Sequence, residues 1–160
     1  MTLTIRLLEH RDLDAVVQMI GDLAEHHGDV PVTDPATLAR DALGPAPWVH
    51  VLVAETTARL IGYAALLPLA QMQIGVRGMD MHHLFVRPEG RGSGVGRAFI
   101  YASKEHARML NCSFLTVGTH PDNRAAAAFY VAAGFIRRPM NAPPRELMSA
   151  ADPDASKTAG

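Results

Sequence analysis

The sequence predicts a single α/β domain in which strands and helices are mixed. Three observations support this class: short stretches in which apolar side chains alternate, longer stretches with helical spacing, and a glycine-rich turn between a strand and a helix. A chain of 160 residues, 48% of them hydrophobic, is long enough to bury one full core. The sequence contains no internal repeat and no evident linker, which also favours one domain.

The first part of the chain predicts one strand followed by two helices. Residues 2–8 alternate polar and apolar side chains, as a strand with one buried face does. Residues 12–27 repeat apolar side chains at intervals of three and four, which predicts an amphipathic helix that Gly28 can end. A capping residue and an early proline predict the start of a second helix, over residues 35–43.

The middle of the chain predicts a series of strands. Residues 49–55 and 59–67 are apolar, β-rich runs, and the three residues between them are few enough for a hairpin turn. Residues 79–86 form a third candidate strand, which leads into the glycine-rich turn. From that turn to Leu110 the apolar residues have helical spacing, so strand, turn and helix follow in order.

The last part of the chain predicts a short strand over 114–117, a helix over 123–133 and the opening of another strand at 135–138. Residues 149–160 are small and polar, and we expect them to form a disordered tail. The folded domain is therefore expected to cover residues 1–148.

Composition narrows the classes of partner. A formal net charge of -1 lacks the basic excess that phosphate binding requires, so we expect no nucleic-acid partner. The longest apolar run, 60–70, is too short to span a bilayer, and the first residues lack the apolar core of a signal peptide. The single cysteine, Cys112, forms no internal disulfide, which fits a reducing compartment. We expect a cytoplasmic protein without a membrane partner.

The glycine-rich turn has features of an anion site. Residues 91–96 lie where a strand enters a helix, so unpaired N–H groups of the first helical turn would point into the turn. Glycines let the backbone approach a phosphate, and the helix dipole adds roughly +0.5 of a charge. The spacing fits G-x-G-x-x-G in neither register, and no Gly-Lys-Ser/Thr follows. A tight corner without a ligand is the alternative.

The pattern that fits is Arg-x-x-Gly-x-Gly, formed by Arg91, Gly94 and Gly96. Here the chain resembles the GNAT superfamily of N-acetyltransferases, whose pyrophosphate-binding motif has this form and position. Residues 123–135 resemble the family's downstream helix, in which an asparagine precedes a Phe-Tyr pair and the helix ends in Gly-Phe. The resemblance covers residues 4–135. It implies the GNAT-like acyl-CoA N-acyltransferase fold, a central mixed twisted sheet flanked by helices.

Within the superfamily, the N-terminal half resembles the polyamine, diamine and thialysine acetyltransferase branch. The residues that carry this likeness are 19–27, 30–33, 53–55, 61–64 and 84–86. That branch has an acidic pair just before the Leu-x-Val strand, where this chain has His82 and His83. The loss of this pair weakens the case for a polycationic acceptor, because a spermidine-like chain needs several carboxylates. The remaining candidate carboxylates are Asp12, Asp22, Glu25 and Asp80.

The resemblance implies acetyl-CoA as the co-substrate. Backbone groups of the 84–86 strand, exposed by a bulge, would bind the pantetheine arm and the thioester, and the amides of the turn would bind the pyrophosphate. The residues expected at the cofactor are Leu84, Phe85, Val86, Arg91, Gly92, Ser93, Gly94, Val95, Gly96, Arg97 and Asn123. Asn123 would also cap its helix. No metal is expected, since adjacent histidines have poor spacing for chelation.

Two catalytic roles follow from the resemblance. Tyr130 is expected to protonate the departing CoA thiolate, because a phenol with a pKa near 10 suits a thiol leaving group; the alternative is a packing tyrosine. His82 is expected to take the proton of the amine, directly or through water, because strand alternation puts it on the face of Leu84 and puts His83 on the other. His83 and Asp80 are weaker candidates. The alternative is that His82 only shapes the acceptor pocket.

The sequence therefore predicts an N-acetyltransferase that acetylates a primary amine of a small molecule, either a polyamine, a diamine or an amino-acid-like amine. The amine would attack the thioester directly in a ternary complex. The alternatives are an aminoglycoside-like or peptide N-terminal acceptor, and a non-catalytic module that binds acyl-CoA for regulation. By analogy with the superfamily, a homodimer is expected.

Overall fold

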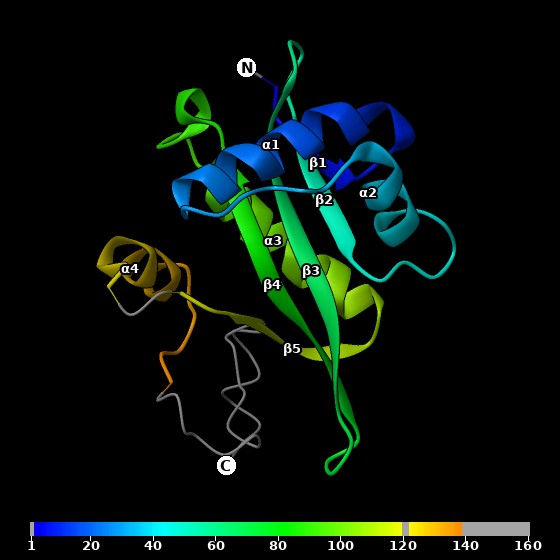
Figure 1. Ribbon diagram of the computed structural model, residues 1–160. Helices are drawn as coiled ribbons and strands as arrows, with labels where there is room; N and C mark the ends of the chain where they lie inside the picture. Colours follow the sequence, from blue (N-terminus) through cyan, green and yellow to red (C-terminus); the bar gives the residue numbers. More distant parts are fainter. Residues whose placement is uncertain (1, 120–121, 139–160) are drawn as a thin grey trace. The chain divides into compact units, whose positions relative to one another are not determined.

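The computed structural model describes residues 2–119 and 122–138, which contain five strands and four α-helices (Figure 1). The elements in chain order are β1 (Thr4–Leu7), α1 (Leu13–His26), α2 (Pro35–Ala42), β2 (His50–Glu55), β3 (Leu60–Gln71), β4 (Val76–Val86), α3 (Val95–Met109), β5 (Cys112–Val117) and α4 (Arg124–Ala132). Short 3-10 turns precede α1 and follow β4. No helix in the described ranges is long and apolar enough to cross a membrane. The predicted tail, 149–160, and the predicted domain end at residue 148 lie outside these ranges.

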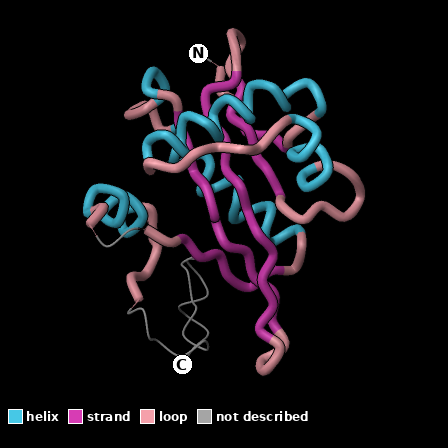
Figure 2. The backbone as a smooth tube through the Cα atoms, in the orientation of Figure 1, coloured by secondary structure: helices cyan, strands magenta, loops and turns pink. Residues whose placement is uncertain are grey.

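The strands, drawn in magenta in Figure 2, form one mixed sheet in the order β1-β2-β3-β4-β5. β1, β2 and β3 pair antiparallel, whereas β4 and β5 pair parallel. This confirms the predicted α/β class with a central mixed sheet. The predicted hairpin between β2 and β3 is also confirmed, and the hydroxyl of Thr56 closes its turn by accepting from the Ala58 and Arg59 amides.

The chain divides into two compact units, and the long strands β3 and β4 run through both. The first unit is Met1–Leu67 with His82–Phe99, and the second is Pro68–Met81 with Ile100–Gly160. The first unit therefore holds β1, β2, α1 and α2, the glycine-rich turn and the first turn of α3. The second unit holds β5, α4 and the rest of α3.

The core of the first unit lies between the two N-terminal helices and the sheet. The apolar faces of α1 and α2 provide Val16, Met19, Leu38 and Ala42, and alternate positions of the strands provide Val51, Val53, Tyr63, Ala65 and Phe85. Each fully buried Val, Leu, Met or Phe side chain stabilises the fold by about 1.5–3 kcal/mol. The period-two and helical patterns in the sequence predict these inward faces because the same side chains exclude water in the fold.

Gly62 lets β3 approach the end of β4 very closely. A Cβ atom at this position would lie 2.6 Å from the carbonyl oxygen of Phe85 and 3.0 Å from a ring carbon of Phe99. Side chains do not tolerate such a distance to backbone, so only glycine fits without moving the strand. Beyond this contact the Arg87 amide donates to the carbonyl of Ile61 over 2.8 Å. The end of β4 is thus held against β3 on both sides of Val86.

In the second unit the first half of β4 pairs with β5, from Arg77 opposite Cys112 to Met81 opposite Val117. A register shift between Arg77 and Gly78 marks a bulge in this ladder. The ring of Phe114 covers Gly78 so closely that a Cβ atom there would overlap it.

The predicted strand at residues 135–138 is wrong. The Phe135 amide donates to the carbonyl of Tyr130 over 3.0 Å, and the Gly134 amide donates to Val131. With Gly134 at a φ of 98°, these bonds close the end of α4 in the manner of a Schellman cap, which uses the Phe135 amide that the expected strand would need for pairing. The predicted closing role of this glycine is confirmed.

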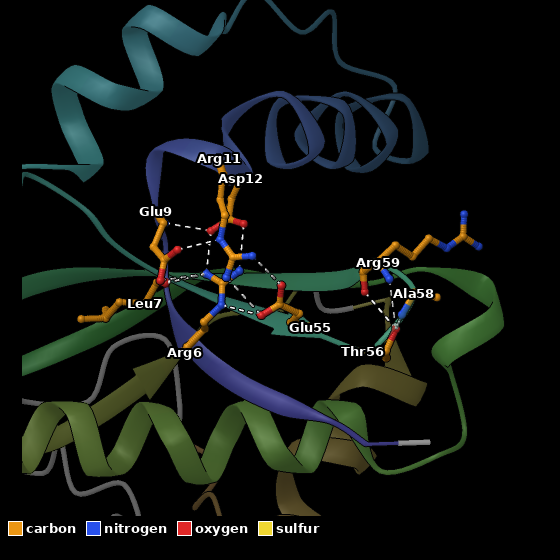
Figure 3. Close-up of polar contacts among 9 residues, drawn as sticks. All are labelled: Arg6, Leu7, Glu9, Arg11, Asp12, Glu55, Thr56, Ala58 and Arg59. Atoms are coloured by element: carbon orange, nitrogen blue, oxygen red, sulfur yellow. Dashed lines mark hydrogen bonds and ion pairs between the residues drawn. The ribbon is translucent and has the colours of Figure 1, made fainter.

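An ion-pair network fixes the start of α1 to the first two strands (Figure 3). Arg6 of β1 donates to both carboxylate oxygens of Asp12, over 2.7 and 2.9 Å, and its Nε donates to Glu55 over 2.8 Å. Asp12 also accepts from the Glu9 amide, and its side chain is 4% exposed. Burial acts to raise the pKa of Asp12, but the bonds from Arg6 and Glu9 lower it overall.

We predict that Asp12→Ala lowers the free energy of unfolding by about 3 kcal/mol at neutral pH, because it leaves the largely buried Arg6 guanidinium without its bidentate partner. Urea unfolding measures this loss. Asp14→Ala removes an exposed carboxylate from the first turn of the same helix and should cost less than about 1 kcal/mol. Since the folded pKa of Asp12 lies below its ordinary value of 3.8, its contribution exists above that pH and disappears as the pH falls through the folded pKa. A difference between the wild type and Asp12→Ala that stays constant into strong acid would contradict this account.

Candidate functional site

The glycine-rich turn lies in the first unit, between the end of β4 and the start of α3. Gly92 and Gly94 have φ angles of 75° and 87°, in the left-handed region that glycine adopts at low cost. Among the described residues, no atom outside their chain neighbours lies within 4 Å of where a Cβ would stand at either position. The turn therefore offers open backbone to a ligand.

The start of α3 supplies hydrogen-bond donors to this turn. The Ala98 amide makes the first bond of the helix, to the carbonyl of Gly94 over 3.0 Å. The amides of Val95, Gly96 and Arg97 come before that bond, where a helix has no acceptor of its own to offer. Such N–H groups, together with the helix dipole, form a binding site for a phosphate or another anion. The order of strand, turn and helix that the sequence predicts is confirmed, and the anion site at this turn stays a prediction.

Side-chain bonds brace the turn against β4. The hydroxyl of Ser93 donates to the carbonyl of Gly90 over 2.7 Å, and Nε of Arg91 donates to the carbonyl of Val86 over 2.9 Å. Gly90 is buried, and a Cβ atom there would come within 3.1 Å of the Val86 side chain. The turn and the strand end are therefore one connected structure. Nε of Arg91 is bonded to the strand, while the residue as a whole remains exposed.

The side chains at the end of β4 differ in how deeply they are buried. Phe85 points into the core, where its ring centroid lies 6.1 Å from that of Tyr63, so any contact of Phe85 with a cofactor must come from its backbone. Leu84 and Val86 are half-buried. The register shift recorded in β4 lies at Arg77/Gly78, so the bulge expected within 84–86 stays a prediction.

The two histidines before this strand end lie side by side. Their rings stack with centroids 4.3 Å apart and an angle of 14° between planes. His83 and Phe85 both contact Tyr63, as the expected strand alternation implies for these two residues. The ring of His82 nevertheless lies against that of His83, so the opposite facing expected for His82 stays a prediction. His82 is exposed and His83 is half-buried.

Tyr63 is the partner of His83, and sequence reasoning did not assign it to the site. Its hydroxyl lies 3.0 Å from Nδ1 of His83, and the residue is 1% exposed. Burial raises the pKa of Tyr63, so the phenol stays protonated. The signal in the sequence is weak. A tyrosine at an inward strand position needs a buried polar partner, but the neighbouring sequence does not identify which residue that partner is.

The surroundings of His83 keep its imidazole neutral. Burial, followed by the charges of His82 and of His27 at the end of α1, lowers the pKa of His83 to about 4. His27 in turn lies beside His26, with ring centroids 5.7 Å apart. The end of α1 and the end of β4 thus bring histidines together in the first unit, which the sequence did not predict.

Two of the four candidate carboxylates are committed elsewhere. Asp12 belongs to the ion-pair network with Arg6, and Asp80 accepts a bond of 2.6 Å from the hydroxyl of Thr116 in the second unit. Asp22 and Glu25 are exposed on α1. In the ranges that the structure describes, no group of three or more His, Cys, Asp or Glu side chains is arranged to hold a metal ion.

The second unit carries the other two predicted site residues, Asn123 just before α4 and Tyr130 within it. The side-chain oxygen of Asn123 accepts from the Ala126 amide over 3.1 Å, which confirms the predicted helix cap. Tyr130 is half-buried between Phe129 and Phe135, with ring centroids 5.3 and 5.7 Å from its own. Burial raises the pKa of Tyr130, so the phenol is protonated at neutral pH.

Comparison with known proteins gives the family. Residues 17–135 match the acetyltransferase (GNAT) family. Thialysine N-epsilon-acetyltransferase of Bos taurus is 28% identical over 141 residues, which cover 81% of this chain and 82% of that protein. N-acetyltransferase family 8 member 3 of Rattus norvegicus is 31% identical over 83 residues, or 52% of this chain, and the match spans 36% of that protein's length.

Solved structures agree on the fold. An aminoglycoside acetyltransferase, HMB0005, from an uncultured soil metagenomic sample superposes with a TM-score of 0.74 at 17% identity, over 89% of this chain and 97% of that one. The fold, the glycine-rich turn before α3 and the match over residues 17–135 all indicate the same family. The chain belongs to the acetyltransferase (GNAT) family.

Proposed function

We propose that the protein transfers the acetyl group of acetyl-CoA to a primary amine of a small molecule, by direct attack of the amine within a ternary complex. The observation that carries this proposal is the open, glycine-rich backbone at the start of α3, braced to the end of β4 by Arg91 and Ser93. Family membership supports it. The relative from Bos taurus, named for thialysine, supports an amine of small size.

The proposed cofactor site follows the turn and the strand end. The amides from Gly92 to Arg97 hold the pyrophosphate, and the backbone of the strand end at Val86 holds the pantetheine arm and the thioester. Arg91 adds positive charge beside the phosphates. The residues assigned to acetyl-CoA are Leu84, Phe85, Val86, Arg91, Gly92, Ser93, Gly94, Val95, Gly96, Arg97 and Asn123.

The chemistry needs an amine without its extra proton. The nitrogen lone pair attacks the thioester carbonyl carbon, a tetrahedral intermediate forms, and the C–S bond then breaks to release CoA. Backbone donors aimed at the oxyanion are each worth about 3 kcal/mol in such reactions. Tyr130 is the proposed acid that protonates the CoA thiolate, and its raised pKa keeps the required proton on the phenol.

His82 is the proposed base, acting directly or through water. It is exposed and stacked on His83, so it can exchange protons with solvent. His83 is a poorer base, because its pKa of about 4 leaves it little affinity for a proton and its Nδ1 already faces the Tyr63 hydroxyl. Asp80 accepts from Thr116, which also weakens it as a base.

We predict that Gly94→Val weakens CoA binding by at least about tenfold, because a β-branched residue resists the left-handed backbone at this position. Isothermal titration with CoA measures the affinity. Gly75→Val is the matched control, since Gly75 has a φ of 67°, is equally open, and lies in the turn between β3 and β4. The control should bind CoA like the wild type. Normal CoA affinity in Gly94→Val would remove the pyrophosphate assignment.

We predict that Tyr130→Phe lowers kcat by about 100-fold and leaves the CoA affinity within about twofold, because general acid catalysis is lost while packing against Phe129 and Phe135 remains. Steady-state thiol release from acetyl-CoA gives kcat, and titration gives the affinity. Tyr101→Phe, which removes the hydroxyl of an exposed tyrosine on α3, should leave both unchanged. If Tyr130→Phe turns over at the wild-type rate, this tyrosine has no part in the chemistry.

A further inference from the structure

We propose that His83, oriented by Tyr63, is a fixed hydrogen-bond donor for an oxygen of the acceptor, and that the preferred acceptor is therefore an amine that also carries a carboxylate. This inference rests on the proposed function, in which the acceptor meets the thioester at the end of β4. It narrows the acceptor from any small primary amine to an amino-acid-like one.

The first step concerns the proton between Tyr63 and His83. The Tyr63 hydroxyl lies 3.0 Å from Nδ1, and the tyrosine is 1% exposed, so no water shell replaces this partner. A buried hydroxyl left without an acceptor costs about 1–3 kcal/mol. A phenol that stays protonated donates, and the nitrogen that it faces accepts. The remaining proton of the neutral imidazole then sits on Nε2, because the bond at one ring nitrogen decides the state of the other.

The second step concerns where that proton points. Nδ1 and Nε2 lie on opposite edges of the ring, so an imidazole whose Nδ1 faces the buried Tyr63 directs Nε2–H away from it. His82 covers one face of the ring at 4.3 Å. His83 is half-buried and not enclosed in the core. The result is an N–H donor of fixed direction next to the strand end.

The third step is the chemistry that such a donor selects. An ammonium group has no lone pair and cannot accept the bond. A free amine that accepted it would tie up the lone pair that must attack the thioester. An oxygen of the acceptor has no such conflict, and a carboxylate oxygen accepts most strongly.

The charges around His83 favour the same acceptor. The charged groups that act on its pKa are His82 on its own strand and His27 at the end of α1, and both are imidazoles. Of the four candidate carboxylates, Asp12 and Asp80 are bonded to Arg6 and Thr116, and Asp22 and Glu25 are exposed on α1. No carboxylate is among the groups that shift the pKa of His83, so an acceptor carboxylate gains a hydrogen bond there without meeting a like charge.

The test compares L-lysine with cadaverine, which is lysine without its α-carboxylate. We expect kcat/KM for lysine to exceed that for cadaverine by at least about tenfold in a thiol-release assay with acetyl-CoA. Ornithine and putrescine form a second matched pair. Equal or better turnover of the diamines would overturn the inference and leave the proposed function intact. If no amine releases CoA, the proposed function fails, and the inference falls with it.

Variants show whether His83 makes the discrimination. His83→Phe keeps an aromatic ring without the donor and should lower the lysine-to-cadaverine ratio by at least about fivefold. His83→Gln carries an amide N–H at a distance from the backbone similar to that of Nε2–H. It should restore a substantial part of the ratio of kcat/KM for lysine to kcat/KM for cadaverine. A ratio that is unchanged in His83→Phe would overturn the role of His83.

A measurement that needs no activity tests the tautomer directly. In long-range ¹H–¹⁵N spectra of the full chain at neutral pH, His83 should show a protonated Nε2 and an unprotonated Nδ1. Tyr63→Phe removes only the hydroxyl and should give a mixture of tautomers. A wild-type spectrum with the proton on Nδ1 of His83 would overturn the proposal, whatever the assays show.

Discussion

The close approach of β3 to the end of β4 is the constraint on which the candidate cofactor site depends. Because Gly62 of β3 has no side chain, the carbonyl of Phe85 in β4 can lie close to the β3 backbone. Two residues after Phe85, the Arg87 amide donates to the carbonyl of Ile61 in β3. Because this strand end is fixed, the turn that follows it is fixed as well, through the bonds of Arg91 and Ser93. The helix dipole and free amides at the start of α3 are thereby presented from a rigid base.

The histidine pair gives this member of the family its own chemistry beside that strand. Carboxylates at these positions would carry charge at neutral pH, whereas His83 is neutral and bonded to a buried phenol. The stacked His82 remains exposed. The pair thus places a neutral imidazole and an exposed ring where carboxylates would hold fixed negative charge.

Much of the fold could be predicted from the sequence, with errors in particular elements. The amphipathic helices α1 and α2 and the caps at Gly134 and Asn123 follow from local patterns, and the structure confirms them. β3 runs to Gln71, past the predicted end, although Pro68 lies within it, because prolines are tolerated where a strand is exposed. Residues 135–138 do not form the expected strand, and the cap of α4 takes up the amide of Phe135, the first residue of that segment.

The sequence by itself determined the order of the elements, the inward faces, and the glycine-rich turn before a helix. These depend on residues a few positions apart, so periodicity and glycine placement are enough to reveal them. Only the tertiary structure decided which side chains meet: Tyr63 with His83, the ring of His82 on that of His83, and Asp12 with Arg6. Such pairs, and the pKa values that burial gives them, arise from contacts and the exclusion of water after folding, which no local pattern contains.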